Sequence, residues 1–151
     1  MIISVNVNGK LYTADVTPHL SLLDFLRAQG FSSVRCGCDT TSCGLCTVWV
    51  DGAPTLSCAF PAVRAQQHNI TTLEGVQTEA DELATFMASQ GADQCGFCSP
   101  GLIMNILAMK RELITPSDAE INAYLAGNLC RCTGYMSHMR IIKAYLQEVS
   151  A

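Results

Sequence analysis

Eight of the nine cysteines in this chain fall into two sets of four, and these sets constrain the fold more than any other feature. The first set comprises Cys38, Cys43, Cys46 and Cys58, and the second comprises Cys95, Cys98, Cys130 and Cys132. Four thiolates are enough to close one metal site. The fold must therefore bring each set together, although both sets are spread along the chain.

The spacing of the first set is the more specific of the two. Cys38, Cys43 and Cys46 follow the pattern C-x4-C-x2-C, and Cys58 comes after a further strand and turn at 47–52. Three thiols from one tight loop and a fourth from elsewhere is the plant-type pattern for a [2Fe–2S] cluster. A pair of structural zinc sites is the alternative, because zinc also takes four thiolates, although this spacing is atypical for it.

The second set is built from two short pairs at predicted helix ends. Residues 94–101 place Cys95 and Cys98 just before a helix, with Ser99 as the expected N-cap and Pro100 at the first helical position. A thiolate near a helix N-terminus lies in a favourable field. The other pair follows the next predicted helix, so the four thiols can close a second site.

Charge and hydropathy exclude several functional classes. The formal charge of -4 argues against nucleic acid, which binds a basic face. No apolar run approaches the roughly 20 residues of a membrane span. The first residues carry no basic or apolar signal segment, so a cytoplasmic location is expected, where disulfides are disfavoured and a metal role for the cysteines is favoured.

The two halves of the sequence predict different structure. Ile3, Val5 and Val7 alternate with polar residues before the hairpin signal Asn8-Gly9, and Ser21 can cap a helix that follows. A last short strand is expected within residues 70–75. These features predict a small mixed sheet with one packed helix, over residues 1–76.

From residue 77 to 151 the pattern is helical throughout. Helix starts are expected at Thr78 with Asp81, at Ser99, at Ser117 with Glu120, and at Ser137. The last helix is expected to reach Val149. The whole chain is therefore predicted to be α+β, with a helical second domain that carries its own four ligands.

The remaining candidates are weaker. His19, His68 and His138 lie outside both cysteine sets and are interpreted as surface or capping histidines. Cys36 is interpreted as a bystander thiol. No nucleophilic triad is visible, so no catalytic residue is assigned to this chain.

Residues 94–101 and 128–135, together with the upstream C-x4-C-x2-C-x11-C set, resemble the iron–sulfur subunit of molybdenum hydroxylases, the family of xanthine dehydrogenase, aldehyde oxidoreductase and carbon monoxide dehydrogenase. The resemblance covers essentially the whole chain. It implies a plant-ferredoxin-like β-grasp domain followed by a four-helix-bundle domain, each with one [2Fe–2S] cluster. Thr41 is a departure, because many members have glycine there.

The resemblance also implies partners and a direction of electron flow. A large subunit would hold molybdopterin and a medium subunit FAD, with electrons passing from molybdenum through the C-terminal cluster and then the N-terminal one to FAD. Gln94 is expected to hydrogen-bond the pterin, and the Cys132 region is expected to be the electron entry point. A free-standing ferredoxin-like carrier and a zinc-binding interaction module are the alternatives.

Overall fold

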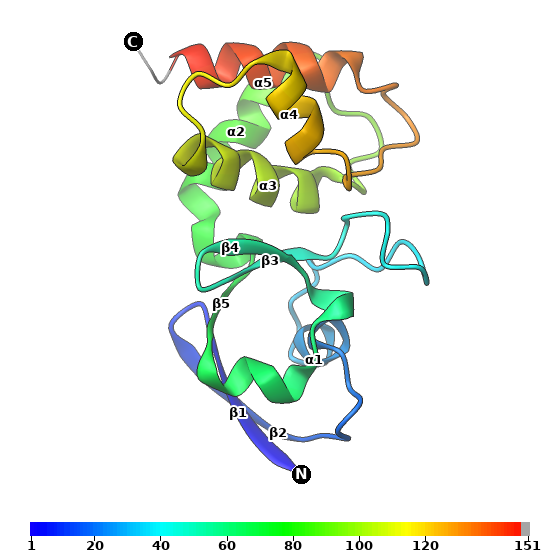
Figure 1. Ribbon diagram of the computed structural model, residues 1–151, viewed down its shortest axis with the longest axis vertical. Helices are drawn as coiled ribbons and strands as arrows, with labels where there is room; N and C mark the ends of the chain where they lie inside the picture. The colour runs from blue at the N-terminus through cyan, green and yellow to red at the C-terminus, as the bar shows by residue number, and fades with distance from the viewer. Residues whose placement is uncertain (149–151) are drawn as a thin grey trace.

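The structure, a computed structural model, describes residues 1–148, so Val149 lies outside the described residues. The strands and helix of the first half lie at one end of the molecule and the later helices at the other (Figure 1). The strands are β1 (Ile2–Val7), β2 (Lys10–Asp15), β3 (Thr47–Val50), β4 (Ala53–Leu56) and β5 (Asn69–Thr71). The helices are α1 (Leu22–Ala28), α2 (Gln77–Ser89), α3 (Ser99–Glu112), α4 (Asp118–Tyr124) and α5 (Met136–Glu148).

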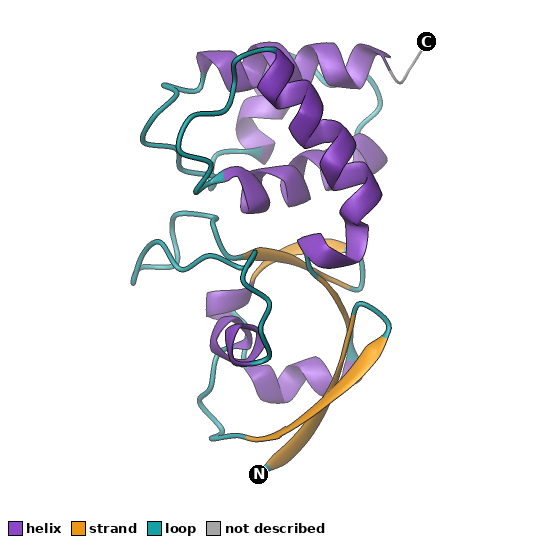
Figure 2. Ribbon diagram, turned by 180° about the vertical axis from the view of Figure 1, so that it is seen from behind, coloured by secondary structure: helices purple, strands orange, loops and turns teal. Residues whose placement is uncertain are grey.

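The five strands form one mixed sheet in the order β2-β1-β5-β3-β4. β1 and β5 are parallel, and the other neighbours are antiparallel. The strands form a curved wall around α1 and the short 3₁₀ segments Ser57–Ala59 and Ala62–Gln67 (Figure 2). The predicted hairpin, strand 47–50 and capped helix are all present, which confirms an α+β chain with a small mixed sheet.

The first core is built by the alternation of β1. Ile3, Val5 and Val7 are at most 1% exposed, because every second side chain of a strand points to the same face. Asn8 and Gly9 turn the chain with φ angles of 53° and 78°, as a two-residue hairpin requires. These strand residues pack with α1 and form one apolar cluster.

β3 joins this core to a second one. All four of its residues are buried, and Trp49 belongs to the apolar cluster of the helices rather than to that of the sheet. The indole Nε1 of Trp49 donates to the Met104 carbonyl at 3.0 Å, and the Arg111 guanidinium lies 3.8 Å from its ring centroid. The outer face of the sheet is therefore covered by α3.

α3 is the central element of the helical part. Every residue from 101 to 109 is buried, because β3 and β4 lie on one side of α3 and the other helices on the other (Figure 1). A helix buried on all faces shows no clear amphipathic period. None of the helices in residues 1–148 has both the length and the apolar character needed to cross a membrane.

The expected helix starts are partly corrected. The capping box is confirmed, since Ser117 Oγ accepts the Glu120 amide at 3.3 Å and Glu120 Oε2 accepts the Ser117 amide at 2.8 Å. Ser99 is the first helical residue rather than the N-cap, and its hydroxyl donates to Asp93 at 3.0 Å. The α2 helix begins at Gln77, after the 3₁₀ segment Leu73–Val76, and α5 begins one residue before Ser137.

Candidate metal centre

The four thiols of the C-terminal set meet beside the N-terminus of α3. The Sγ atoms of Cys132 and Cys95 are 3.5 Å apart, and those of Cys98 and Cys130 lie within 4.8 Å of each other. Each close pair takes one cysteine from the segment before α3 and one from the loop before α5. Cys95 and Cys132 are exposed, whereas Cys98 and Cys130 are half-buried, so the site has an outer and an inner end.

Hydrogen-bond donors surround the inner end. The Thr133 hydroxyl donates to Cys130 Sγ at 3.2 Å. Burial opposes ionisation of Cys130, but this bond and the amides of Thr133 and Cys132 together lower its pKa. Burial, followed by the neighbouring Cys130 thiol, raises the pKa of Cys98 to about 12. A metal must therefore displace a firmly held proton from Cys98.

The N-terminal set is arranged in the same way. The thiols of Cys38 and Cys43 contact each other, as do those of Cys46 and Cys58. The amide of Ser42, followed by the Cys43 thiol and two further amides, lowers the pKa of Cys38 to about 6. Burial, followed by the Cys46 thiol, raises the pKa of Cys58 to about 12. Each set thus contains a thiol whose pKa is lowered, Cys38 or Cys130, and a half-buried thiol whose pKa is raised, Cys58 or Cys98.

The loop that holds the first set is conformationally restrained. Thr41 and Gly44 have left-handed φ angles of 55° and 72°. Glycine adopts this region freely, but a β-branched residue adopts it at a cost. The position of Thr41 is therefore one that glycine would occupy without strain, and the turn aims the amides of Ser42, Thr40 and Cys43 at Cys38.

The donor chemistry of both sets fits a [2Fe–2S] group. Each set offers four thiol sulfurs in two close pairs, and amide or hydroxyl hydrogens point at several of them. Such donors offset the negative charge of an iron–sulfur cluster and adjust its reduction potential. Cys36 is exposed and belongs to neither arrangement.

The two sets lie on either side of a narrow seam between the halves of the chain. The Leu129 amide donates to the Cys43 carbonyl at 2.9 Å, which joins the residue before Cys130 to a member of the first set. Gly101 of α3 faces the same loop, because a Cβ added there would lie 2.5 Å from the Gly44 carbonyl oxygen. Close backbone approach therefore brings the two sites together.

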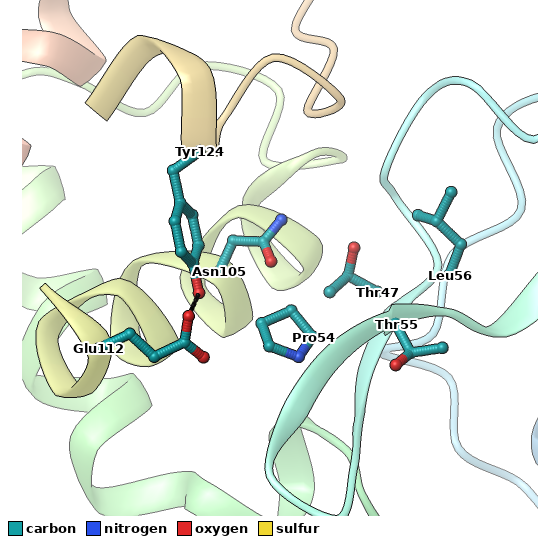
Figure 3. A pocket seen from close by; sticks show the side chains of 7 residues that line it. All are labelled: Thr47, Pro54, Thr55, Leu56, Asn105, Glu112 and Tyr124. Carbon is teal, nitrogen blue, oxygen red and sulfur yellow. Dashed lines mark hydrogen bonds between the residues drawn. The ribbon is translucent and has the colours of Figure 1, made fainter. Parts of the chain in front are cut away.

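A separate hollow of about 340 Å³ lies between β4 and the helices α3 and α4 (Figure 3). Tyr124 and Glu112 line it, and the Tyr124 hydroxyl donates to Glu112 at 2.8 Å. Burial, together with this carboxylate, raises the pKa of Tyr124. Since the hollow contains no member of either cysteine set, it is separate from the candidate metal centre.

His138 differs from its prediction as a surface or capping residue. It is 5% exposed, and a ring nitrogen lies within 4.8 Å of the Sγ atoms of Cys98 and Cys130. Burial lowers its pKa, and the Ala92 carbonyl and Asp93 oppose that shift, so the ring is neutral near pH 7. Its spacing of three from Ile141 was the sequence signal for this buried face, because residues three apart share a helix face.

The other polar candidates lie where solvent reaches them. Gln94 is exposed in the loop before Cys95, and His19 is exposed. His68 is half-buried and contacts Asp51 at 2.5 Å in the turn between β3 and β4. Thr133, which the sequence did not single out, has a hydroxyl that donates directly to the candidate ligand Cys130.

Two family models together match almost the whole chain. The 2Fe-2S iron-sulfur cluster binding domain matches residues 5–83, and the [2Fe-2S] binding domain matches residues 72–144. The xanthine dehydrogenase iron-sulfur-binding subunit of Escherichia coli is 43% identical over 141 residues, which cover 88% of this chain and 86% of that protein.

A second relative and a solved structure agree with this assignment. The nicotinate dehydrogenase small FeS subunit of Eubacterium barkeri is 40% identical over 137 residues, or 89% of this chain and 87% of that protein. Quinoline 2-oxidoreductase from Pseudomonas putida 86 superposes with a TM-score of 0.87 and 36% identity, covering 97% of this chain and 92% of the matched chain.

The chain belongs to the iron–sulfur subunits of the molybdenum hydroxylase family. As a member of this family, it is an iron–sulfur, electron-transfer subunit of an oxidoreductase complex. A free-standing carrier and a zinc-binding module are not favoured.

Proposed function

We propose that this chain holds two [2Fe–2S] clusters and passes electrons from a molybdopterin-binding large subunit to an FAD-binding medium subunit in the cytoplasm. The observation that carries the proposal is the pair of four-thiol sets, each with its own donors, on either side of one hydrogen-bonded seam. Residues 1–76 form the ferredoxin-like β-grasp domain. Residues 77–151 form the second cluster domain, with α2 to α5 as its four-helix bundle.

The close thiol pairs support a division of ligands between the iron ions. The N-terminal pairs are Cys38 with Cys43 and Cys46 with Cys58; the C-terminal pairs are Cys95 with Cys132 and Cys98 with Cys130. Two thiolates on each iron complete the four-ligand requirement of this cluster type. When bound, such a cluster accepts and releases one electron at a time.

The exposed end of the C-terminal set supports its place at the partner that holds molybdopterin. Cys95 and Cys132 are exposed, and several large apolar side chains near them are exposed too. These side chains are Phe97, Leu129, Tyr135 and Met136. Exposed apolar groups of this kind mark protein contacts. We therefore place electron entry at the Cys132 region.

The seam supports transfer between the two sites. The Leu129 amide and the Cys43 carbonyl connect the two ligand sets through one hydrogen bond of 2.9 Å. Buried residues of α3 and β3 pack beside it and keep the loops in place. The N-terminal set then lies on the route to the flavin subunit.

Gln94 supplies a test of this arrangement. An exposed amide both donates and accepts, which suits the mixed edge of a pterin ring. In the purified complex, Gln94→Ala should slow substrate-driven reduction of the clusters about 2- to 10-fold, because one hydrogen bond contributes about 0.5–1.5 kcal/mol. Rapid-mixing absorption spectroscopy measures this rate, and iron content should stay unchanged.

Gln147→Ala is the matched control, since Gln147 is an exposed glutamine near the C-terminal end of α5, whereas Cys132 precedes the N-terminal end of that helix. It should leave the rate of reduction unchanged. Equal rates for the two variants would remove Gln94 from the proposed entry point. Recovery of the native chain without any molybdenum-containing partner would contradict the proposed function itself.

A further inference from the structure

Three side chains at the inner end of the C-terminal set form a ligand group that differs from the four-thiol set. Cys98, Cys130 and His138 each place one ligand atom within 4.8 Å of the other two. They come from the α3 N-cap, the loop before α5, and the first turn of α5. The structure therefore places two sulfur atoms and one nitrogen atom close enough together to bind a single metal ion.

His138 is held in place by its surroundings. It is 5% exposed and lies on the same helix as the fully buried residues Ile141 and Ile142. The ring hydrogen-bonds the Ala92 carbonyl and lies edge-on to Tyr135, with centroids 6.5 Å apart. Metal-binding histidines commonly donate their second N–H to a backbone carbonyl, which fixes the tautomer and leaves a lone pair on the other nitrogen.

Two thiolates and one imidazole match the ligand preference of zinc-class divalent ions. Zinc binds sulfur at about 2.3 Å and nitrogen at about 2.0 Å in a tetrahedron, so neighbouring ligand atoms stand about 3.5–3.8 Å apart. A contraction of about 1 Å from the observed limit of 4.8 Å brings the three atoms to that spacing. Thr133 already stabilises the Cys130 thiolate at 3.2 Å.

We propose that the iron-free chain binds a single zinc-class divalent ion through Cys98, Cys130 and His138, with the fourth position open. Binding replaces the thiol protons and involves no electron transfer. Because the ion uses two thiols that the proposed cluster also needs, zinc and the C-terminal cluster exclude each other. The proposal concerns the iron-free chain, so its test is independent of the test of the proposed function.

The test uses the full chain, stripped of iron under reducing conditions, labelled with ¹⁵N-histidine and loaded with ¹¹³Cd²⁺. The chain has three histidines, and a metal held only by the four thiols of the N-terminal set has no nitrogen ligand, so it gives no ¹¹³Cd–¹⁵N coupling in this spectrum. We expect one histidine nitrogen to show ¹¹³Cd–¹⁵N coupling. Absence of coupling at saturating cadmium in the unmodified chain overturns the proposal.

Variants then assign the ligands. His138→Leu and Cys98→Ser should each remove the coupling, whereas Cys95→Ser should retain it, because Cys95 lies at the outer end of the site. Coupling that persists in His138→Leu would assign the bond to another histidine and overturn the proposal. Loss of coupling in a folded Cys95→Ser chain, checked by its methyl spectrum, would also overturn the three-ligand site.

Discussion

Cys132→Ser should abolish the C-terminal cluster and slow substrate-driven reduction of the N-terminal cluster by more than about 100-fold in the assembled complex. Loss of outer-shell partners of a metal site already costs about 10–100-fold, and Cys132 is a proposed direct ligand 3.5 Å from Cys95. The N-terminal cluster should remain, because its thiols lie in a separate loop. Electron paramagnetic resonance of the dithionite-reduced complex should lose one of two signals.

Cys36→Ser is the matched control for this variant. Cys36 is an exposed thiol that undergoes the same chemical change but lies outside both sets. Both resonance signals and the rate of reduction should be unchanged in this variant. If Cys36→Ser lost a signal, or if Cys132→Ser kept both, the ligand assignment would be wrong.

Gly44→Ala should lower the free energy of unfolding by about 2–5 kcal/mol. Gly44 has a φ of 72°, where an L side chain costs about 1–2 kcal/mol. An added Cβ would also collide with the Gly127 carbonyl oxygen and approach Asn128 Cα to 3.0 Å, and such overpacking costs about 1–3 kcal/mol. The melting temperature should fall by about 2–4 °C per kcal/mol in a chain of this size.

Gly91→Ala measures the backbone effect without the collision. Gly91 has a similar φ of 63°, but nothing lies within 4 Å of an added Cβ. Its free energy of unfolding should fall by the backbone contribution alone, about 1–2 kcal/mol. Calorimetry of the two cluster-loaded variants compares them directly. Equal shifts would show that the seam tolerates an added methyl group and is less tightly packed than described here.

Local sequence signals predicted the fold where short-range physics controls it. Alternation in β1, the hairpin at Asn8-Gly9 and the capping box of Ser117 with Glu120 each depend on residues a few positions apart, and each is confirmed. Ser99 differed because the helix begins one residue earlier, which makes Ser99 its first residue, and the Ser99 hydroxyl donates to Asp93. Cap residues compete for several local partners, so their exact role is less predictable than helix existence.

The arrangement of the site depended on contacts that no local pattern encodes. The C-x4-C-x2-C loop predicts which thiols gather, but the Leu129 bond to Cys43 joins residues 86 positions apart, as their numbers 129 and 43 show. The burial of His138, which projects from α5 towards Cys98 and Cys130, is likewise a tertiary effect. The sequence marked it as an ordinary histidine because it stands outside every cysteine motif.

The measurement that tests the central claim most directly is metal and sulfide analysis of the chain purified without air. Two [2Fe–2S] clusters require about four iron ions and about four acid-labile sulfides per chain, with two distinct resonance signals after reduction. The account predicts this stoichiometry and a red-brown protein whose colour fades on reduction. Stoichiometric zinc without sulfide, or iron sufficient for one cluster only, would contradict it.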